Sequence, residues 1–158
     1  WRVELEMELA LKSQLLDVVI IESTADGGST SAELPDGLEN LRPHNLLTYK
    51  SVHESLNPWA LDELTGHYVN YRKLQISPKG MLPKAELFGL YAVATLTPKG
   101  LKRACSLLPT AWDGVYDLRW GGQVVRVIVL NEVEKAERNA YWELFASEQD
   151  RMRAGLGH

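Results

Sequence analysis

The chain has 158 residues, 45% of them hydrophobic, and a formal net charge of −4. This length suits one globular domain that buries roughly two thirds of its unfolded surface, so we expect a single domain over residues 1–158. The single cysteine, Cys105, excludes an intrachain disulfide and a cysteine-based zinc site, and the cytoplasm is the expected compartment. No apolar stretch approaches the ~20 residues needed to cross a bilayer, so no membrane partner is expected. The acidic balance argues against strong non-specific binding to nucleic acid, although a local basic cleft would still attract a polyanion.

Two strands are predicted near the start of the chain. Residues 3–11 alternate strictly between apolar and mostly charged side chains, which is typical of a half-buried strand. Residues 15–21 are almost continuously apolar, which indicates a strand covered on both faces, and the two strands are expected to form a hairpin. Small and polar residues then dominate residues 23–40, which predicts a long, mobile loop with a turn at Pro35-Asp36-Gly37.

The middle of the chain predicts a strand, a helix and another strand. Residues 44–50 form the third expected strand, and Asn57 followed by Pro58 is an N-cap and first-turn pair that starts a helix reaching about residue 73. A fourth apolar strand is expected over residues 87–96. Because a helix joins the third and fourth strands, these two strands should run parallel.

A hairpin and a helix are predicted to complete the chain. Residues 99–105 indicate a short helix, and residues 115–120 and 123–130 indicate two strands joined by Gly121-Gly122. A final helix is expected over about 133–154, with Glu134 and Arg138 at favourable four-residue spacing and a stop at Gly155. The predicted fold is therefore α/β, with a mixed sheet that is antiparallel at its start and parallel at the crossover.

Three ionisable residues in these predicted elements are candidates for a functional site. Asp17 interrupts the second apolar run, Lys50 ends the third strand, and Glu63 lies in the second turn of the helix. Metal-dependent hydrolysis of a phosphodiester needs carboxylate oxygens to hold a hard cation and a fixed positive charge beside the attacked phosphorus. An Asp on one strand, a Lys on the next and a Glu from the following helix can supply these groups at one place.

These residues, with Thr48-Tyr49-Lys50, resemble the PD-(D/E)XK (restriction endonuclease-like) nuclease superfamily. Its core has the order α-β-β-β-α-β, with Asp on the second strand and (D/E)-x-K on the third. The resemblance covers about residues 1–96 and places the first helix upstream of Trp1. Thr48 stands where the pattern has Asp or Glu, but some members carry Ser or Thr there and supply the carboxylate from the following helix, about a dozen residues after the lysine. Twelve residues separate Lys50 from Glu63.

Further along the helix, His67 and Tyr71 look like the Q-x-x-x-Y element of the superfamily's recombination-type exonucleases, with His in place of Gln. Residues 44–51 and 66–73 are similar to bacterial Rpn-like recombination-promoting nucleases, also described as putative transposases. The resemblance implies a DNA endonuclease that uses Mg²⁺ or Mn²⁺.

The resemblance also implies a role for each site residue. Asp17 and Glu63 would bind the metal, and Lys50 would orient the attacking water or stabilise charge on phosphorus. Backbone carbonyls near Tyr49 would complete the metal shell, and Thr48, His67 and Tyr71 would be accessory residues. A homodimer is left open, because many nucleases of this fold pair two sites to cut two strands.

A second interpretation belongs to another class, a nuclease-derived fold that no longer cleaves and serves as an interaction module. The acidic composition and Thr48 favour it. Asp17 would then be a surface acid, Lys50 the point where a strand leaves the core, and Glu63 part of an ordinary polar helix face. Pro35-Asp36 also spells the literal start of the motif, but Pro-Asp-Gly turns are routine in such loops and the family's Asp belongs on a strand. Asp17 is therefore preferred.

Overall fold

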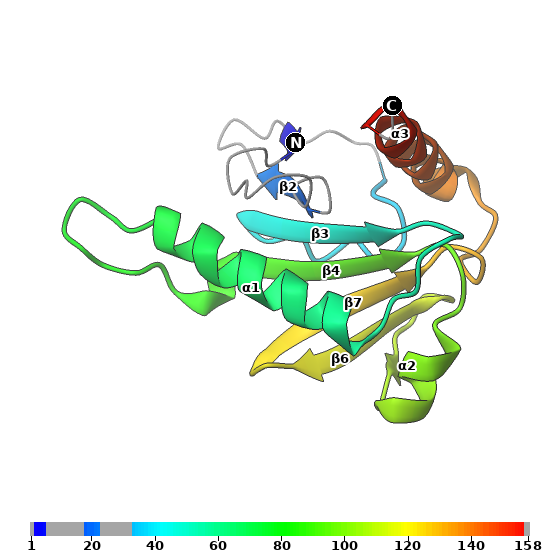
Figure 1. Ribbon diagram of the computed structural model, residues 1–158, viewed down its shortest axis with the longest axis horizontal. Helices are drawn as coiled ribbons and strands as arrows, with labels where there is room; N and C mark the ends of the chain where they lie inside the picture. Colours follow the sequence, from blue (N-terminus) through cyan, green and yellow to red (C-terminus); the bar gives the residue numbers. More distant parts are fainter. Residues whose placement is uncertain (1, 6–17, 23–32, 157–158) are drawn as a thin grey trace.

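The computed structural model describes residues 2–5, 18–22 and 33–156, which fold into an open mixed β-sheet with helices on both faces (Figure 1). The seven strands lie in the order β1-β2-β3-β4-β7-β6-β5. Their bounds are β1 Arg2–Leu5, β2 Val18–Glu22, β3 His44–Lys50, β4 Phe88–Ala94, β5 Leu108–Pro109, β6 Val115–Trp120 and β7 Gln123–Val129. The helices are α1 Pro58–Leu74, α2 Lys99–Ala104 and α3 Ala140–Leu156, with 3₁₀ turns η2 Ala85–Leu87 and η3 Glu137–Asn139. The predicted α/β class is confirmed.

The first half of the sheet has the predicted directions. β1 pairs antiparallel with β2, and β2 pairs antiparallel with β3 in a register that sets Val18 opposite Thr48. α1 then crosses over to β4, which runs parallel to β3. Of the two predicted N-terminal strands, β1 covers only Arg2–Leu5 and β2 only Val18–Glu22, and the remainder of both predictions lies outside the described residues.

α1 begins and ends where its sequence signals predict. The Asn57 side-chain carbonyl accepts a hydrogen bond of 2.9 Å from the backbone N–H of Ala60, and Pro58 occupies the first turn, where its missing N–H is not needed. The apolar side of the helix buries Leu61 and Leu64 against the sheet. This N-cap fixes the start of α1 beside the carboxyl end of β3.

The second half of the sheet is built on the predicted hairpin. Gly121 and Gly122 have φ of 55° and 79°, the left-handed conformations that a tight two-residue hairpin turn requires and that glycine adopts without strain. β7 pairs antiparallel with β6 on one side and parallel with β4 on the other. The hairpin therefore extends the sheet beyond the crossover unit.

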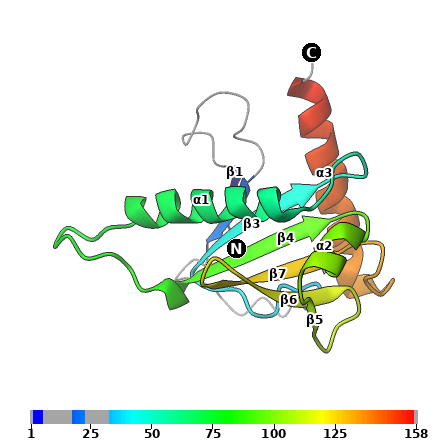
Figure 2. The same cartoon turned by 60° about the horizontal axis from the view of Figure 1, so that its bottom comes forward.

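The sheet separates two apolar cores. One face carries α1 and α2, and its core includes Leu46, Ala92 and Val127. The other face carries α3, with Trp142 and Phe145 packed on Leu47, Tyr49 and neighbouring strand residues. Figure 2 shows α1 and α3 on opposite sides of the strands. β3 and β4 are covered on both faces, which accounts for their nearly continuous apolar sequences.

The last helix does not have its predicted bounds. α3 begins at Ala140, after the 3₁₀ turn η3, and continues through Gly155 to Leu156. The preceding residues leave the helical path because Asn139 is held by tertiary bonds: its amide donates 2.9 Å to the Glu134 carbonyl and 2.8 Å to the Asp36 carboxylate. The predicted pair of Glu134 and Arg138 does form, at 2.6 Å, although neither residue lies within α3.

The loop predicted to be mobile over 23–40 is packed in its second half. Residues 23–32 lie outside the described residues, but Pro35, Asp36, Gly37 and Leu38 are buried. The predicted turn at Pro35-Asp36-Gly37 is present, with the Leu38 N–H donating 3.0 Å to the Pro35 carbonyl and Gly37 at φ 98°. The Asp36 N–H donates 2.8 Å to the Asn139 side-chain carbonyl in η3, and the Trp142 ring N–H in α3 donates 3.0 Å to the Asp36 carbonyl, so the turn docks onto η3 and the start of α3.

Candidate functional site

Lys50 is the last residue of β3 and lies at the edge where the parallel strands end. It pairs with Ala94 of β4 and is half-buried. Because side chains alternate along a strand, Thr48 and Lys50 share the α1 face with the core residue Leu46, whereas Tyr49 points to the α3 face. Within the described residues the Lys50 ammonium group has no hydrogen-bond or ion-pair partner.

Glu63 lies on the same side of the sheet as Lys50. Asp62, its neighbour in α1, accepts a 2.9 Å hydrogen bond from the Trp120 ring N–H and so marks the flank of the helix that faces the β6–β7 hairpin. Successive residues are about 100° apart around the axis of an α-helix. Glu63 therefore lies on the flank opposite to Asp62, the flank that faces β3 and β2. Glu63 is half-buried there. Thr48, Lys50 and Glu63 therefore share one face.

The hydroxyl and the backbone carbonyl of Tyr49 both make hydrogen bonds within the protein. Its hydroxyl lies 3.0 Å from the Thr95 hydroxyl and donates to the Asp150 carboxylate at 3.3 Å. Burial raises the pKa of this phenol, with Asp150 adding to the rise, so the hydroxyl remains a donor at neutral pH. Backbone carbonyls near Tyr49 were expected to complete a metal shell, and the Tyr49 carbonyl itself accepts a hydrogen bond from Arg153 of α3.

Arg153 is the residue at this edge that sequence reasoning missed. Its guanidinium lies over the Tyr49 ring at 5.2 Å and forms an ion pair with Glu54, in the turn that follows β3. The contact joins residues about a hundred positions apart, and nothing in the local sequence of α3 distinguishes Arg153 from a basic residue favoured near a helix C-terminus. Only the docking of α3 across the sheet brings it here.

The accessory residues of α1 lie elsewhere. The Tyr71 hydroxyl donates 2.8 Å to the Glu22 carboxylate and lies 3.0 Å from Nδ1 of His44, whose ring stacks on Phe88. His44 and Lys50 are the two ends of β3, about 20 Å apart at the rise of a strand. Tyr71 is therefore not brought together with Lys50, and His67, half-buried one turn earlier, has no partner within the part of the chain that is described.

The predicted metal ligands are not assembled by the described residues alone. Asp17 lies outside them, Glu63 is the only carboxylate of the predicted pair that they include, and no group of three or more His, Cys, Asp or Glu that could hold a metal occurs among them. Asp36, the alternative acid, binds Arg138 through both oxygens at 2.7 and 3.0 Å. This carboxylate anchors a turn and is not free to act as a ligand.

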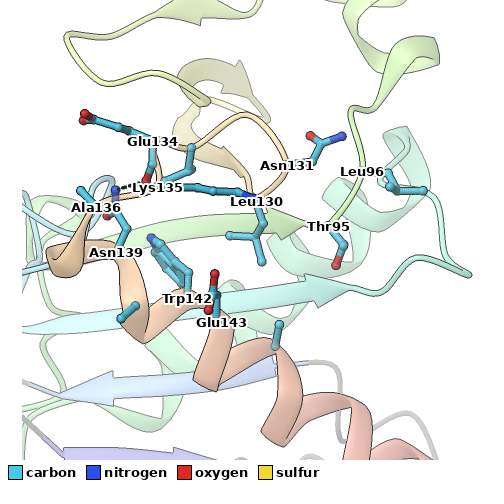
Figure 3. A pocket seen from close by; sticks show the side chains of 13 residues that line it. Thr95, Leu96, Leu130, Asn131, Glu134, Lys135, Ala136, Asn139, Trp142 and Glu143 are labelled. Carbon is cyan, nitrogen blue, oxygen red and sulfur yellow. Dashed lines mark hydrogen bonds between the residues drawn. The ribbon is translucent and has the colours of Figure 1, made fainter.

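Two hollows open at the carboxyl edge of the parallel strands. A cavity of about 690 Å³ lies between the turn after β3 and the turn after β4, next to Lys50 in sequence although Lys50 does not line it. A second cavity, of about 500 Å³, lies between the ends of β4 and β7 and the first turns of α3, and is largely apolar (Figure 3). Ligands of open α/β sheets bind beyond the carboxyl ends of the strands, so this edge is the candidate functional site.

Comparison with protein-family models, curated proteins and solved structures found no match for this chain. In the described part of the chain, none of the helices has both the length and the apolar character that a membrane span requires. The site therefore has to be argued from its own residues.

Proposed function

We propose that this chain is a metal-dependent DNA nuclease domain of the PD-(D/E)XK type, with a catalytic carboxylate moved from β3 to α1. The observation that carries the proposal is the order of elements around Lys50: an antiparallel β1-β2-β3 meander, the α1 crossover, and a parallel β4. Lys50 occupies the last position of β3, on the face under α1. These features agree with the order and residue placement expected for the restriction endonuclease-like core.

Each residue has one role in the proposal. Asp17 and Glu63 would hold Mg²⁺ or Mn²⁺, and the bound cation would stabilise negative charge at the phosphate under attack. Lys50 would place its ammonium group beside the same phosphate, with no structural ion pair within the described residues to neutralise it. The proposal requires the Asp17 carboxylate to reach the α1 face. Val18 already occupies that face in β2 and successive strand residues alternate, so the proposal also requires the chain to depart from regular strand geometry at Asp17.

A metal titration tests the proposal before any substrate is added. Isothermal titration of Mn²⁺ into the parent should show one site, and both Asp17→Asn and Glu63→Gln should weaken binding at least tenfold, because each removes a charged oxygen ligand. Glu148→Gln, an exposed acid of α3 that lines neither cavity, is the matched control and should bind as the parent does. Equal affinity in the parent and in Glu63→Gln would show that Glu63 is not a ligand.

The rival function is a nuclease-derived interaction module that does not cleave. The bond from Arg153 to the Tyr49 carbonyl favours it, since that bond engages a backbone oxygen in the region where the nuclease site was expected to draw carbonyl ligands. A folded parent that takes up no Mn²⁺ and leaves DNA intact would replace the nuclease proposal with this module.

A further inference from the structure

The connection between α1 and β4 projects from the body of the protein as a basic arm, defined here as residues 72–84. In both ribbon views it extends beyond the end of the sheet, at the far left (Figures 1 and 2). It lies at the amino end of β4, whereas Lys50 lies at the carboxyl end of β3. The arm is thus separate from the candidate functional site.

The arm has a defined shape. At its tip the Gly80 N–H donates 2.8 Å to the Ser77 carbonyl, and the Ser77 N–H donates 3.0 Å to the Met81 carbonyl, which closes a turn around Pro78 and Lys79. At its base Arg72 donates 2.9 Å to the Pro83 carbonyl and 3.2 Å to the Tyr68 hydroxyl. These bonds fix both ends of the arm.

Charge is distributed unevenly along the chain, and the arm lies in an acid-free, basic stretch. Four of the seventeen Lys and Arg residues, and none of the twenty-one Asp and Glu residues, fall between residues 64 and 85. Lys73, Lys79 and Lys84 are exposed and have no ion-pair partner within the described residues. A protein with net charge −4 therefore presents an acid-free, positively charged projection.

Apolar side chains lie between these lysines. Leu74 and Met81 are 62% and 67% exposed, and Ile76 and Leu82 are each 47% exposed. Proteins that grip the DNA minor groove combine lysines on the phosphates with Leu, Ile, Met or Pro against the sugars and base steps. The composition of the arm fits that mode of contact.

The outer face of α1 continues the acid-free surface toward the site. Between Glu63 and the arm, the exposed positions of the helix are Gly66, Val69 and Asn70. The acid-free part of α1, residues 64–74, is about 16 Å long, or about five base pairs of duplex. A straight tract of this length suits a rod-shaped polyanion better than a flat anionic membrane, which would also meet the acidic remainder of the chain.

We infer that the arm is a DNA anchor, with Lys73, Lys79 and Lys84 on phosphates and Met81 and Leu82 in the minor groove. The duplex would run along α1 toward Lys50. The inference rests on the proposed function for its choice of DNA as partner, but it concerns binding that needs neither the metal nor cleavage.

The test measures binding without catalysis, by fluorescence anisotropy of a labelled 25-base-pair duplex in EDTA. Lys73→Gln/Lys79→Gln/Lys84→Gln should weaken binding at least tenfold at 100 mM salt and lower the slope of log K against log salt by about 2 to 3, since each lost phosphate contact removes about 0.9. The matched control Arg103→Gln/Arg119→Gln/Arg151→Gln removes the same charge from exposed positions elsewhere and should change affinity less than threefold. Met81→Ser/Leu82→Ser should weaken binding and leave the salt slope unchanged. Circular dichroism confirms folding of each variant.

If the arm triple variant and its control lose the same DNA affinity, the inference is overturned, because the overall charge of the protein would then account for binding. A parent that ignores the duplex but binds vesicles of anionic phospholipid through these lysines would overturn it in favour of a membrane surface. Failure of the nuclease proposal gives a different pattern: Lys50→Ala and the parent would bind the duplex equally well, the arm triple variant would bind weakly, and none would cleave.

Discussion

Lys50 is half-buried at the end of β3, and its ammonium group has no acidic partner in the part of the chain that the structure describes. Its neighbours in the motif are fixed differently: Thr48 is 3% exposed on the α1 face, and Tyr49 is 1% exposed on the α3 face. The tripeptide thus ends in one half-buried charged group at the strand end, next to two buried side chains. In the proposed nuclease this group would contact the phosphate.

Lys50→Ala should reduce DNA cleavage by about 100-fold or more, as removal of one charge-stabilising donor does in other active sites. Metal affinity and thermal stability should be close to those of the parent, since the ammonium group has no partner among the described residues to lose. Lys50→Arg should recover only part of the rate, because a planar fork does not replace a point charge. Single-turnover nicking of plasmid measures the rates, and full activity in Lys50→Ala would remove this residue from the mechanism.

At the level of single residues, the sequence predicted the conformations that depend on local neighbours. It did not predict the side-chain partners that depend on tertiary contacts. The Asn57 cap and the glycines at 121 and 122 act within a few residues of themselves, so their conformations could be read from the sequence. The engagement of Tyr71 with Glu22 and His44 could not, because it depends on which ends of β2, β3 and α1 meet. The position of Asp17 lies outside the described residues, and its role stays a prediction.

The docking of the 35–38 turn onto α3 is the main feature at the scale of elements that the sequence did not predict. Pro-Asp-Gly indicated an exposed turn, yet Asp36 is 3% exposed and bound to Arg138 and Asn139. The partners lie about a hundred residues away, in a stretch whose composition resembles a helix. The same contact explains both differences from the prediction. It buries the turn, and it places the start of α3 at Ala140 and not near residue 133.

Asp36→Asn should destabilise the fold by about 2 kcal/mol at neutral pH, the usual value of hydrogen bonds to a charged group. Burial by itself would raise the pKa of Asp36, but hydrogen bonds from Arg138 and Asn139 hold that pKa below its ordinary value. This stabilisation is therefore present above about pH 4, the unfolded pKa, and is lost as the pH falls through the folded pKa. Urea unfolding at pH 7 and pH 3 should show the difference between parent and variant shrinking with acid. A difference that stays constant with pH would assign the effect to packing.

Asn57→Ala should destabilise the start of α1, the helix that carries Glu63. Loss of the 2.9 Å bond to the Ala60 N–H leaves one helix N–H without its cap and should lower the free energy of unfolding by about 1 kcal/mol. Thermal unfolding gives the change, and Asn70→Ala, an exposed mid-helix position, is the control, which should be neutral or slightly stabilising. Equal melting temperatures for parent and Asn57→Ala would show that the cap contributes nothing.

At the scale of the whole molecule, apolar patterning was enough to predict the α/β class, the parallel crossover and the hairpin. It did not predict which strand the hairpin would join, and the structure sets β7 beside β4. The overall charge of −4 also concealed the basic arm, because composition averages over segments. The molecule therefore has two distinct regions that the proposal connects: a carboxyl edge with Lys50, and an acid-free tract from Leu64 of α1 to the arm.

Cleavage of supercoiled plasmid tests the nuclease proposal most directly, with the parent, Glu63→Ala and the control Glu148→Ala purified in parallel. The parent and the control should nick DNA in Mg²⁺ or Mn²⁺ and not in EDTA, and Glu63→Ala should be at least 100-fold slower while its circular dichroism and melting temperature are unchanged. Glu63→Ala that cleaves as fast as the parent would contradict the moved carboxylate. No metal-dependent cleavage by a folded parent would contradict the nuclease itself.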